Sequence, residues 1–233
     1  MNSLYQKTFK LRSVHVDYAQ KMRLSVFLKE VQNACIAHTE ELGMGREKTL
    51  DRGYLWVVDS LHFKVDRLPV YDEEVTLKCH PGPTLHYFFP RHFALLSHDG
   101  KTLIRGNAMW SLIDSSTRKM VDPNDIGVTI SGMETGEEIP PVMGLAIPDA
   151  GEHHEIVASY SLCDINGHLT NSAYMDIATD LMELSDIHSI KEVALLFKKE
   201  VRLGDTLSFD CMKEDNRYDF VSPNFALRLT LSE

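Results

Sequence analysis

Apolar side chains between residues 24 and 38 recur every three or four positions, which is the spacing of one face of an α-helix. This pattern predicts a long amphipathic helix that ends near Gly43 and Gly45, because helices often end at glycine. His38 falls on the apolar face and is interpreted as a core histidine with a hydrogen-bond partner. The residues of this face are Leu24, Phe27, Leu28, Val31, Ala34, Cys35 and His38.

Stretches rich in β-branched and aromatic residues flank this helix and predict strands. A first strand is expected within residues 4–16, where apolar positions partly alternate. A helix followed by an antiparallel meander is typical of the α+β class and lacks the strand–helix alternation of a parallel sheet. The later strands are expected at 55–63, 75–79, 87–97 and 102–113.

The second half begins with the same kinds of pattern. Residues 156–162 alternate between apolar and polar or small side chains, which predicts a half-buried strand. Apolar residues at helical spacing follow from Ala173 to Leu184 and predict a helix. The turn between them carries Asp164, Asn166 and His168 within five residues, next to a helix start whose free N–H groups favour negative charge.

The chain also repeats itself, which indicates two copies of one unit. At an offset of 147 residues, Asp17, Ser25 and Phe27 of the first half match Asp164, Ser172 and Tyr174 of the second. Further on, Phe63-Lys64-Val65-Asp66 is aligned with Phe197-Lys198-Lys199-Glu200.

The two copies differ in their polar residues. Ala19 and Lys21 stand where Asn166 and His168 stand, so only the second copy keeps the full polar set. Residues 121–150 are rich in Pro, Gly and acidic side chains, and they are interpreted as the linker between the copies.

Composition narrows the class of protein. The chain has 233 residues, 43% apolar and 25% charged, as in an ordinary globular protein. Its net charge of −10 argues against nucleic acid as a partner. No apolar run approaches the roughly 20 residues of a membrane helix, and the N-terminus does not read as a signal peptide. Four scattered cysteines predict reduced thiols in the cytoplasm and no zinc site: Cys35, Cys79, Cys163 and Cys211.

The segment Asp164-x-Asn166-x-His168-x-x-Asn171-x-x-Tyr174 resembles the signature of acyl-acyl-carrier-protein (acyl-ACP) thioesterases of plants and bacteria. The resemblance implies a double hotdog, in which each of two modules wraps a curved antiparallel sheet round a long helix. It further implies an N-terminal module at 1–122 that shapes the acyl pocket, a linker at 123–150, and a catalytic C-terminal module at 151–233.

The same resemblance implies the site residues. Asp164, Asn166, His168 and Glu200 are the expected catalytic residues, and Asn171 and Tyr174 are expected to bind substrate. Plant members carry a cysteine after the glutamate, whereas this chain has Val201. The expected reaction is therefore hydrolysis of fatty acyl-ACP by activated water, without a thiol nucleophile, a metal or a cofactor. A mostly apolar site would make Glu200 a suitable general base.

The residues themselves leave several points open. The base could be Glu200, Asp164 or His168. An acyl-CoA thioesterase and a non-catalytic acyl-binding hotdog protein remain alternatives, although a binding module does not need the complete polar set. The expected partners are acyl carrier protein and the fatty acyl chain, with no membrane. The preferred chain length and dimerisation through sheet edges are open.

Overall fold

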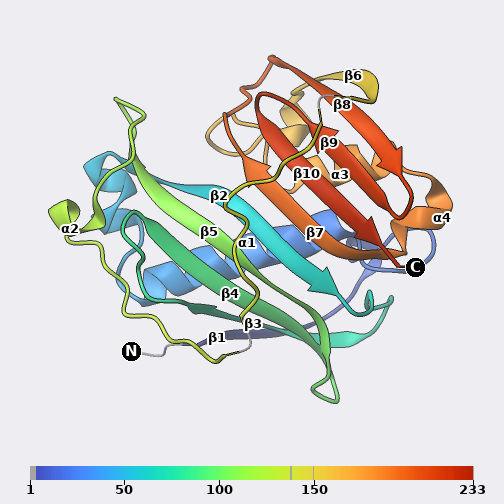
Figure 1. Ribbon diagram of the computed structural model, residues 1–233. Helices are drawn as coiled ribbons and strands as arrows, with labels where there is room; N and C mark the ends of the chain where they lie inside the picture. Colours follow the sequence, from blue (N-terminus) through green and yellow to red (C-terminus); the bar gives the residue numbers. More distant parts are fainter. Residues whose placement is uncertain (1–3, 137, 149, 233) are drawn as a thin grey trace.

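A computed structural model describes residues 4–136, 138–148 and 150–232, and its strands form a single antiparallel sheet (Figure 1). The first half contributes β1 (Tyr5–Lys10), β2 (Tyr54–Val65), β3 (Glu74–Pro81), β4 (Phe88–Ser97) and β5 (Thr102–Asp114). The second half contributes β6 (Glu152–Val157), β7 (Ile190–Phe197), β8 (Thr206–Glu214), β9 (Arg217–Val221) and β10 (Phe225–Leu231). Their order across the sheet is β1-β3-β4-β5-β2-β7-β10-β9-β8-β6.

Two helices cover one face of this sheet. The first is α1 (Leu24–Glu41), and the second is the shorter α3 (Ala173–Asp180). Both lie behind the strands in Figure 1 and share one hydrophobic core. The predicted α+β double hotdog is confirmed, with a helix of 18 residues in the first module and one of 8 in the second. Two single-turn α-helices are also present, α2 (Pro123–Ile126) and α4 (Leu184–Ile187).

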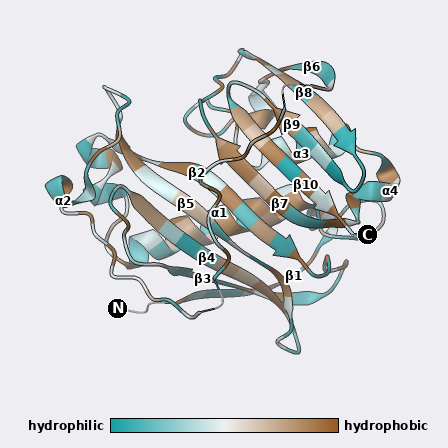
Figure 2. Cartoon of the chain, in the orientation of Figure 1, coloured by the Kyte–Doolittle hydropathy of each residue, from teal (hydrophilic) through white to brown (hydrophobic). Residues whose placement is uncertain are grey.

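The predicted helix at 24–38 is α1, and its apolar face explains its position. Phe27 is fully buried, and its ring packs edge-on against Phe63 of β2 at 5.6 Å and Phe93 of β4 at 5.7 Å. Figure 2 shows apolar residues along both the helix and the strands that it contacts. The helix ends at Glu41, and Gly43 follows with a φ of +70°, as expected of a glycine that stops a helix.

The two modules are joined through their central strands. β2 pairs with β7 from Ser60 opposite Leu196 to Lys64 opposite Glu192. Leu195 is fully buried on this ladder. The ladder therefore makes one sheet and one core out of the two copies.

The strand predictions at 4–16 and 156–162 are only partly correct, because β1 covers Tyr5–Lys10 and β6 covers Glu152–Val157. In both copies the strand stops and a 3₁₀ turn follows, at Ser13–His15 and at Tyr160–Leu162. Tyr160, expected on the half-buried strand, is 88% exposed. The last cross-strand bonds run from the N–H of Leu11 to the Glu73 carbonyl and from that of Ala158 to the Asp205 carbonyl. Beyond them the backbone bonds locally, with the N–H of His15 donating to the Arg12 carbonyl and that of Leu162 to the Ser159 carbonyl.

The predicted helix from Ala173 to Leu184 is also interrupted. α3 ends at Asp180, and the chain turns before α4. The backbone N–H of Glu183 donates to the Tyr218 hydroxyl at 3.3 Å instead of to a helix carbonyl. That hydroxyl in turn donates to Asp186 at 2.8 Å, which fixes the start of α4.

The segment after α2 crosses the face of the sheet opposite α1 (Figure 1). His62 of β2 contacts the Pro140 carbonyl through Nδ1 at 2.6 Å, and Asn107 of β5 donates to the Ile139 carbonyl. Farther along, Arg228 of β10 donates to the Ala146 carbonyl at 3.4 Å. The segment is thus tied to strands of both modules. Across the described part of the chain, no helix has the length and apolar character needed to cross a membrane.

Candidate active site

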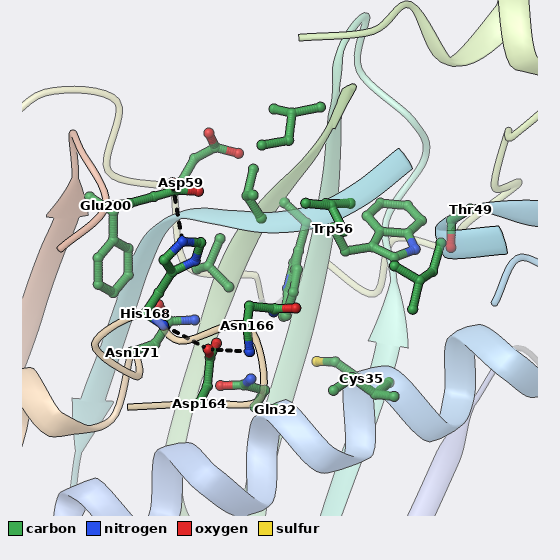
Figure 3. Close-up of a pocket in the computed structure, with 18 of the residues that line it drawn as sticks. Gln32, Cys35, Thr49, Trp56, Asp59, Asp164, Asn166, His168, Asn171 and Glu200 are labelled. Atoms are coloured by element: carbon green, nitrogen blue, oxygen red, sulfur yellow. Dashed lines mark hydrogen bonds and ion pairs between the residues drawn. The ribbon is translucent and has the colours of Figure 1, made fainter. Parts of the chain in front are cut away.

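A pocket of roughly 830 Å³ lies at the junction of the two modules. The first module supplies α1, the N-terminal part of β2 and aromatic residues such as Phe89 and Trp110. The second module supplies the 164–174 loop and the segment that follows β7. Figure 3 shows Asp164, Asn166 and His168 at one end of this space and Trp56 towards the other. The pocket therefore has a polar end and an aromatic end.

The polar loop is held by the carboxylate of Asp164. Its Oδ1 accepts the backbone N–H of Asn166 at 2.8 Å and that of His168 at 3.1 Å (Figure 3). The N–H of Asp164 donates to the His168 carbonyl at 2.8 Å, and Gly167 has a φ of +71° that the turn requires. Asp164 thus fixes the backbone from which Asn166 and His168 project.

The first module builds the same turn without an asparagine or a histidine at the positions of Asn166 and His168. Asp17 Oδ1 accepts from the N–H groups of Ala19 at 2.9 Å and Lys21 at 3.0 Å. Because the aspartate makes these bonds in both copies, they belong to the architecture of the turn. The second module differs in the side chains that the turn presents.

His168 meets Glu200 at the polar end of the pocket. The Nε2 of His168 lies 3.5 Å from a carboxylate oxygen of Glu200 (Figure 3). The two side chains are 22% and 33% exposed, so solvent reaches both. A water molecule beside this pair could hydrogen-bond a carboxylate and an imidazole at once.

Arg118 also contacts Glu200 and comes from the other module. It lies in the turn after β5 and forms an ion pair with the Glu200 carboxylate. The expected mostly apolar surroundings of Glu200 are therefore wrong. The side chain is partly exposed and paired with a cation, which favours the charged carboxylate. The site is shared between the modules.

The sequence alignment of Asp66 with Glu200 is wrong by two positions. The N–H groups of Asp66 and Arg67 both bond the Leu103 carbonyl, and those of Lys198 and Lys199 both bond the Asn224 carbonyl. Asp66 therefore corresponds to Lys198.

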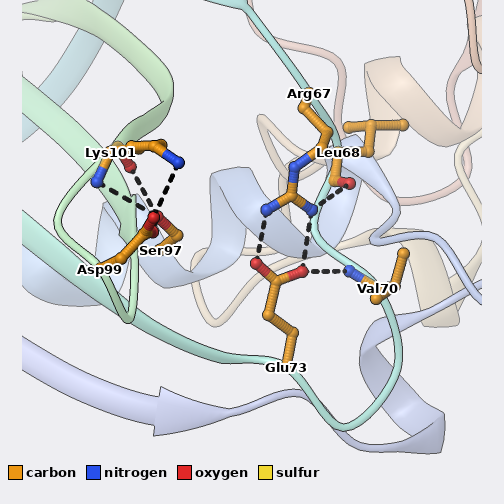
Figure 4. Close-up of polar contacts among 7 residues, drawn as sticks. All are labelled: Arg67, Leu68, Val70, Glu73, Ser97, Asp99 and Lys101. Atoms are coloured by element: carbon orange, nitrogen blue, oxygen red, sulfur yellow. Dashed lines mark hydrogen bonds and ion pairs between the residues drawn. The ribbon is translucent and has the colours of Figure 1, made fainter.

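The turns that follow β2 and β7 support the same alignment of the two copies. The N–H of Val70 donates to the Glu73 carboxylate at 3.0 Å (Figure 4), and the N–H of Arg202 donates to Asp205 at 3.0 Å. Glu200 hence corresponds to Leu68, which is 8% exposed. An acid stands in the second copy where the first copy has a buried apolar residue.

The surroundings of His168 favour its neutral form. Partial burial is the main cause that lowers the pKa of His168, and the charges of Arg118 and Arg202 lower it further. Asp164 opposes this effect but does not reverse it. At neutral pH the imidazole can therefore accept a proton or donate a hydrogen bond without carrying a positive charge.

The remaining predicted residues also border the pocket. The Asn166 side chain is exposed at its polar end, and Asn171 lines it close by. Tyr174 is 4% exposed and packs against Phe197 at 5.3 Å and Phe225 at 4.9 Å. Its burial raises the pKa of the phenol. Tyr174 is thus mainly a core residue with one side towards the pocket.

Sequence reasoning missed two pocket residues, Arg118 and Asp59. Arg118 has no local signal, because its partner lies in the other module. Asp59 does have one, since it is an acid inside the apolar run of β2. It occupies a register shift between Val58 and Ser60, and one of its oxygens is buried without a hydrogen-bond partner among the described residues. Burial raises the pKa of Asp59 to about 6.

Candidate metal ligands are not gathered anywhere in the described ranges, where no group of three His, Cys, Asp or Glu side chains could hold an ion. The polar end of the pocket presents a carboxylate, an imidazole, an amide and nearby guanidinium groups.

Solved structures similar to this chain share its architecture. An acyl-ACP thioesterase from Bacteroides thetaiotaomicron superimposes with a TM-score of 0.86 at 22% identity, over 99% of this chain and 98% of that chain. A 12:0-ACP thioesterase from Umbellularia californica gives a TM-score of 0.83 at 19% identity, over 100% and 98%. These similarities establish the fold.

Sequence comparison gives the family. A chloroplastic acyl-[acyl-carrier-protein] hydrolase of Cuphea viscosissima is 20% identical over 91% of this chain, and the match spans 57% of that protein. The chain thus spans less than two thirds of the length of this curated plant relative. The family model of the acyl-ACP thioesterase N-terminal domain matches residues 2–126, and that of the C-terminal domain matches residues 146–230. With both domains matched in order, the chain belongs to the acyl-ACP thioesterase family.

Proposed function

We propose that this protein hydrolyses the thioester of a fatty acyl-ACP to free fatty acid and carrier, using water as the nucleophile. The observation that carries the proposal is the contact between His168 and Glu200 at the polar end of the pocket, in a chain of this family. Val201 follows Glu200 and offers no nucleophile, which supports attack by water.

Glu200 is proposed as the general base. A water molecule near its carboxylate would lose a proton as it attacks the thioester carbonyl, and positioned proton transfer of this kind is typically worth about 10²–10⁴ in rate. The ion pair with Arg118 supports this role because it favours a charged carboxylate that is ready to accept the proton.

His168 and Asn166 are proposed to act on the carbonyl and on the water. A neutral imidazole and an amide can both donate hydrogen bonds, and such donors stabilise the negative charge that develops on the carbonyl oxygen. Asp164 is proposed as a positioning residue, because its carboxylate holds the backbone of both donors. The thiolate of the carrier arm then leaves.

The acyl chain is proposed to occupy the aromatic end of the pocket. The first module, 1–122, would supply most of that wall, whereas the second module, 151–233, would carry Asp164, Asn166, His168 and Glu200. Asn171 and Tyr174 border the same space and are proposed to contact substrate near the thioester. Residues 123–150 are proposed as the linker that ties the modules together.

The cellular compartment and the oligomeric state of the enzyme can also be proposed. All four cysteines are free thiols, which is typical of a reducing compartment and supports a cytoplasmic enzyme. β1 and β6 end the sheet, so a homodimer through sheet edges would use one of them.

A direct test compares carriers. Purified protein is assayed for free fatty acid release from acyl-ACP and from acyl-CoA over a series of medium to long chains. The proposal predicts a kcat/KM for acyl-ACP that exceeds that for acyl-CoA at one chain length. Preference for acyl-CoA would favour the alternative thioesterase, and tight acyl binding without turnover would favour a binding protein.

A further inference from the structure

Two cysteines meet inside the first module, away from the proposed reaction centre. Cys35 of α1 and Cys79 of β3 place their sulfur atoms 3.6 Å apart. They are 3% and 0% exposed, respectively. This separation is hydrogen-bonding distance for two thiols and is longer than a disulfide bond.

Arg91 lies beside this pair and is buried with only 3% exposure. Its guanidinium donates to Nδ1 of His38 at 3.0 Å and to the hydroxyl of Thr39. Both partners are neutral acceptors. Among the residues that the structure describes, Arg91 has no carboxylate within the 4.0 Å of an ion pair. An arginine stays charged in a protein, and an unpaired buried charge is costly.

The bond from Arg91 fixes the tautomer of His38. Arginine can only donate, so Nδ1 of His38 accepts and the proton of the neutral ring lies on Nε2. His38 also hydrogen-bonds Cys79. The remaining N–H of the ring is therefore directed to sulfur, which makes Cys79 the acceptor in that bond.

Cys79 thus accepts the bond from His38, and in its bond with Cys35 either thiol can be the donor. Two further ionisable groups lie near this cluster: Tyr5 of β1, whose ring is 5.9 Å from that of His38, and His80 of β3, which interacts electrostatically with Cys79 and Arg91. The Cys35 hydrogen bond is the largest cause that lowers the pKa of the Cys79 thiol, with His38 and the charge of Arg91 adding to it. The same bond and burial raise the pKa of Cys35.

We propose that Cys79 is a buried thiolate that neutralises Arg91, and that Cys79 and Cys35 together form an oxidisable dithiol in the wall of the acyl pocket. Cys35, Thr39 and Arg91 all line that pocket, so a small peroxide that enters it reaches Cys35. The oxidation state of the pair would change the wall that faces the acyl chain.

The oxidation would run in two steps with hydrogen peroxide as oxidant. Cys35 passes its proton to Cys79, attacks one peroxide oxygen and becomes a sulfenic acid, while the other oxygen leaves as water after taking a proton. Cys79, again a thiolate, then attacks the Cys35 sulfur and displaces hydroxide, which is protonated to water. The two sulfurs lose two electrons, and one peroxide gives two waters.

The first test measures thiolate absorbance in the ultraviolet as the folded protein is titrated. An ordinary thiol is only roughly 3% ionised at pH 7, so a thiolate at Cys79 would raise the ionised fraction of that residue about thirtyfold. Wild type and the control variants Cys163→Ser and Cys211→Ser should show about one thiolate at pH 7, and Cys79→Ser should lose it. Equal absorbance in wild type and in folded Cys79→Ser would overturn the proposal.

The second test treats the full-length protein with hydrogen peroxide and maps its cysteines by mass spectrometry without reduction. The expected product joins Cys35 to Cys79 with the loss of two hydrogens, and it is absent from Cys79→Ser. A folded Arg91→Met variant should form this disulfide more slowly. The test on the wild-type protein does not depend on whether Arg91→Met folds. Oxidation of Cys163 or Cys211 while Cys35 and Cys79 stay reduced would contradict the proposal.

Discussion

Arg118 of the first module and Glu200 of the second form an ion pair at the polar end of the pocket. Each of the two side chains is 33% exposed, and the pair crosses the junction that the β2–β7 ladder creates. The first module therefore contacts the proposed general base directly, in addition to lining part of the pocket.

If Arg118 positions Glu200, removing its guanidinium should affect turnover more than substrate binding. Arg118→Met is expected to lower kcat by about tenfold or more, because a displaced base loses its alignment with the water. Arg118→Lys should recover part of the loss. Steady-state kinetics on acyl-ACP measures both values, with Lys119→Met in the same turn as the control. A change in KM alone would assign Arg118 to carrier binding instead.

Asp164 can be tested against its counterpart in the first module. Asp164→Asn keeps an oxygen that accepts the two backbone N–H bonds, so its kcat should stay within about tenfold of wild type. Asp164→Ala releases the turn and should cost about a hundredfold, the effect of misplacing catalytic groups by roughly 1 Å. Asp17→Ala should lower the melting temperature and leave kcat within a few-fold. An Asn variant as impaired as the Ala variant would mean that the carboxylate itself handles a proton.

The buried carboxyl group of Asp59 should make the free energy of unfolding depend on pH. Burial raises its pKa to about 6 in the folded state, above the value of about 3.9 in an unfolded chain. Between about pH 3.9 and 6 the folded protein therefore binds more protons than the unfolded chain. The contribution of Asp59 to the free energy of unfolding falls as the pH rises through this range. Asp59→Asn should therefore stabilise the protein by about 1–3 kcal/mol above pH 6, with the gain lost below about pH 4.

Urea unfolding at both pH values measures this gain. Asp99 is the control of opposite sign, because hydrogen bonds from Ser97 and Lys101 lower its pKa to about 2 (Figure 4). Asp99→Asn should lower stability at neutral pH. A stability gain of Asp59→Asn that is equal at acidic and neutral pH would contradict the linkage.

Docking of an acidic carrier should make the KM for acyl-ACP depend on salt concentration. Basic side chains of both modules border the pocket, including Arg46, Lys199 and Arg202. If an acidic carrier docks there, KM for acyl-ACP should rise severalfold between low and physiological salt, because exposed charges are screened. Lys199→Glu should raise KM even at low salt. Lys101→Glu, in the turn between β4 and β5, is the matched control, and a KM insensitive to both salt and Lys199→Glu would exclude this surface.

The sequence predicted those elements whose pattern depends on local burial. α1 and the strands of the first meander could be found because one face of each is apolar along its whole length. The turn at Asp164 could be found because its polar residues lie close together in the chain. Its bonds to Asn166 and His168 follow from the preference of aspartate for such turns.

Features that depend on how the modules meet could not be predicted in this way. Arg118 reaches Glu200 only because β2 and β7 pair. The false match of Asp66 with Glu200 arose because Phe-Lys occurs in both copies, at positions that are not equivalent in the two sheets. The break after α3 depends on the Tyr218 hydroxyl, which lies far along the chain.

The most direct test of the account is the turnover of Glu200→Gln on acyl-ACP. Glu200 occupies a position where the first copy has the buried Leu68. Asp66 lies on the corresponding segment of the first copy, is exposed, and does not line the pocket. Asp66→Asn is therefore the control for loss of a carboxylate. Both variants are checked for folding by their melting temperatures and are then assayed on one acyl-ACP substrate.

The account predicts that Glu200→Gln lowers kcat by at least about a hundredfold, as expected for a lost general base, while its melting temperature barely changes. Asp66→Asn should keep kcat within a few-fold of wild type. Equal losses in the two variants, or normal turnover by folded Glu200→Gln, would contradict the claim that water is activated by Glu200 at the junction of the two modules.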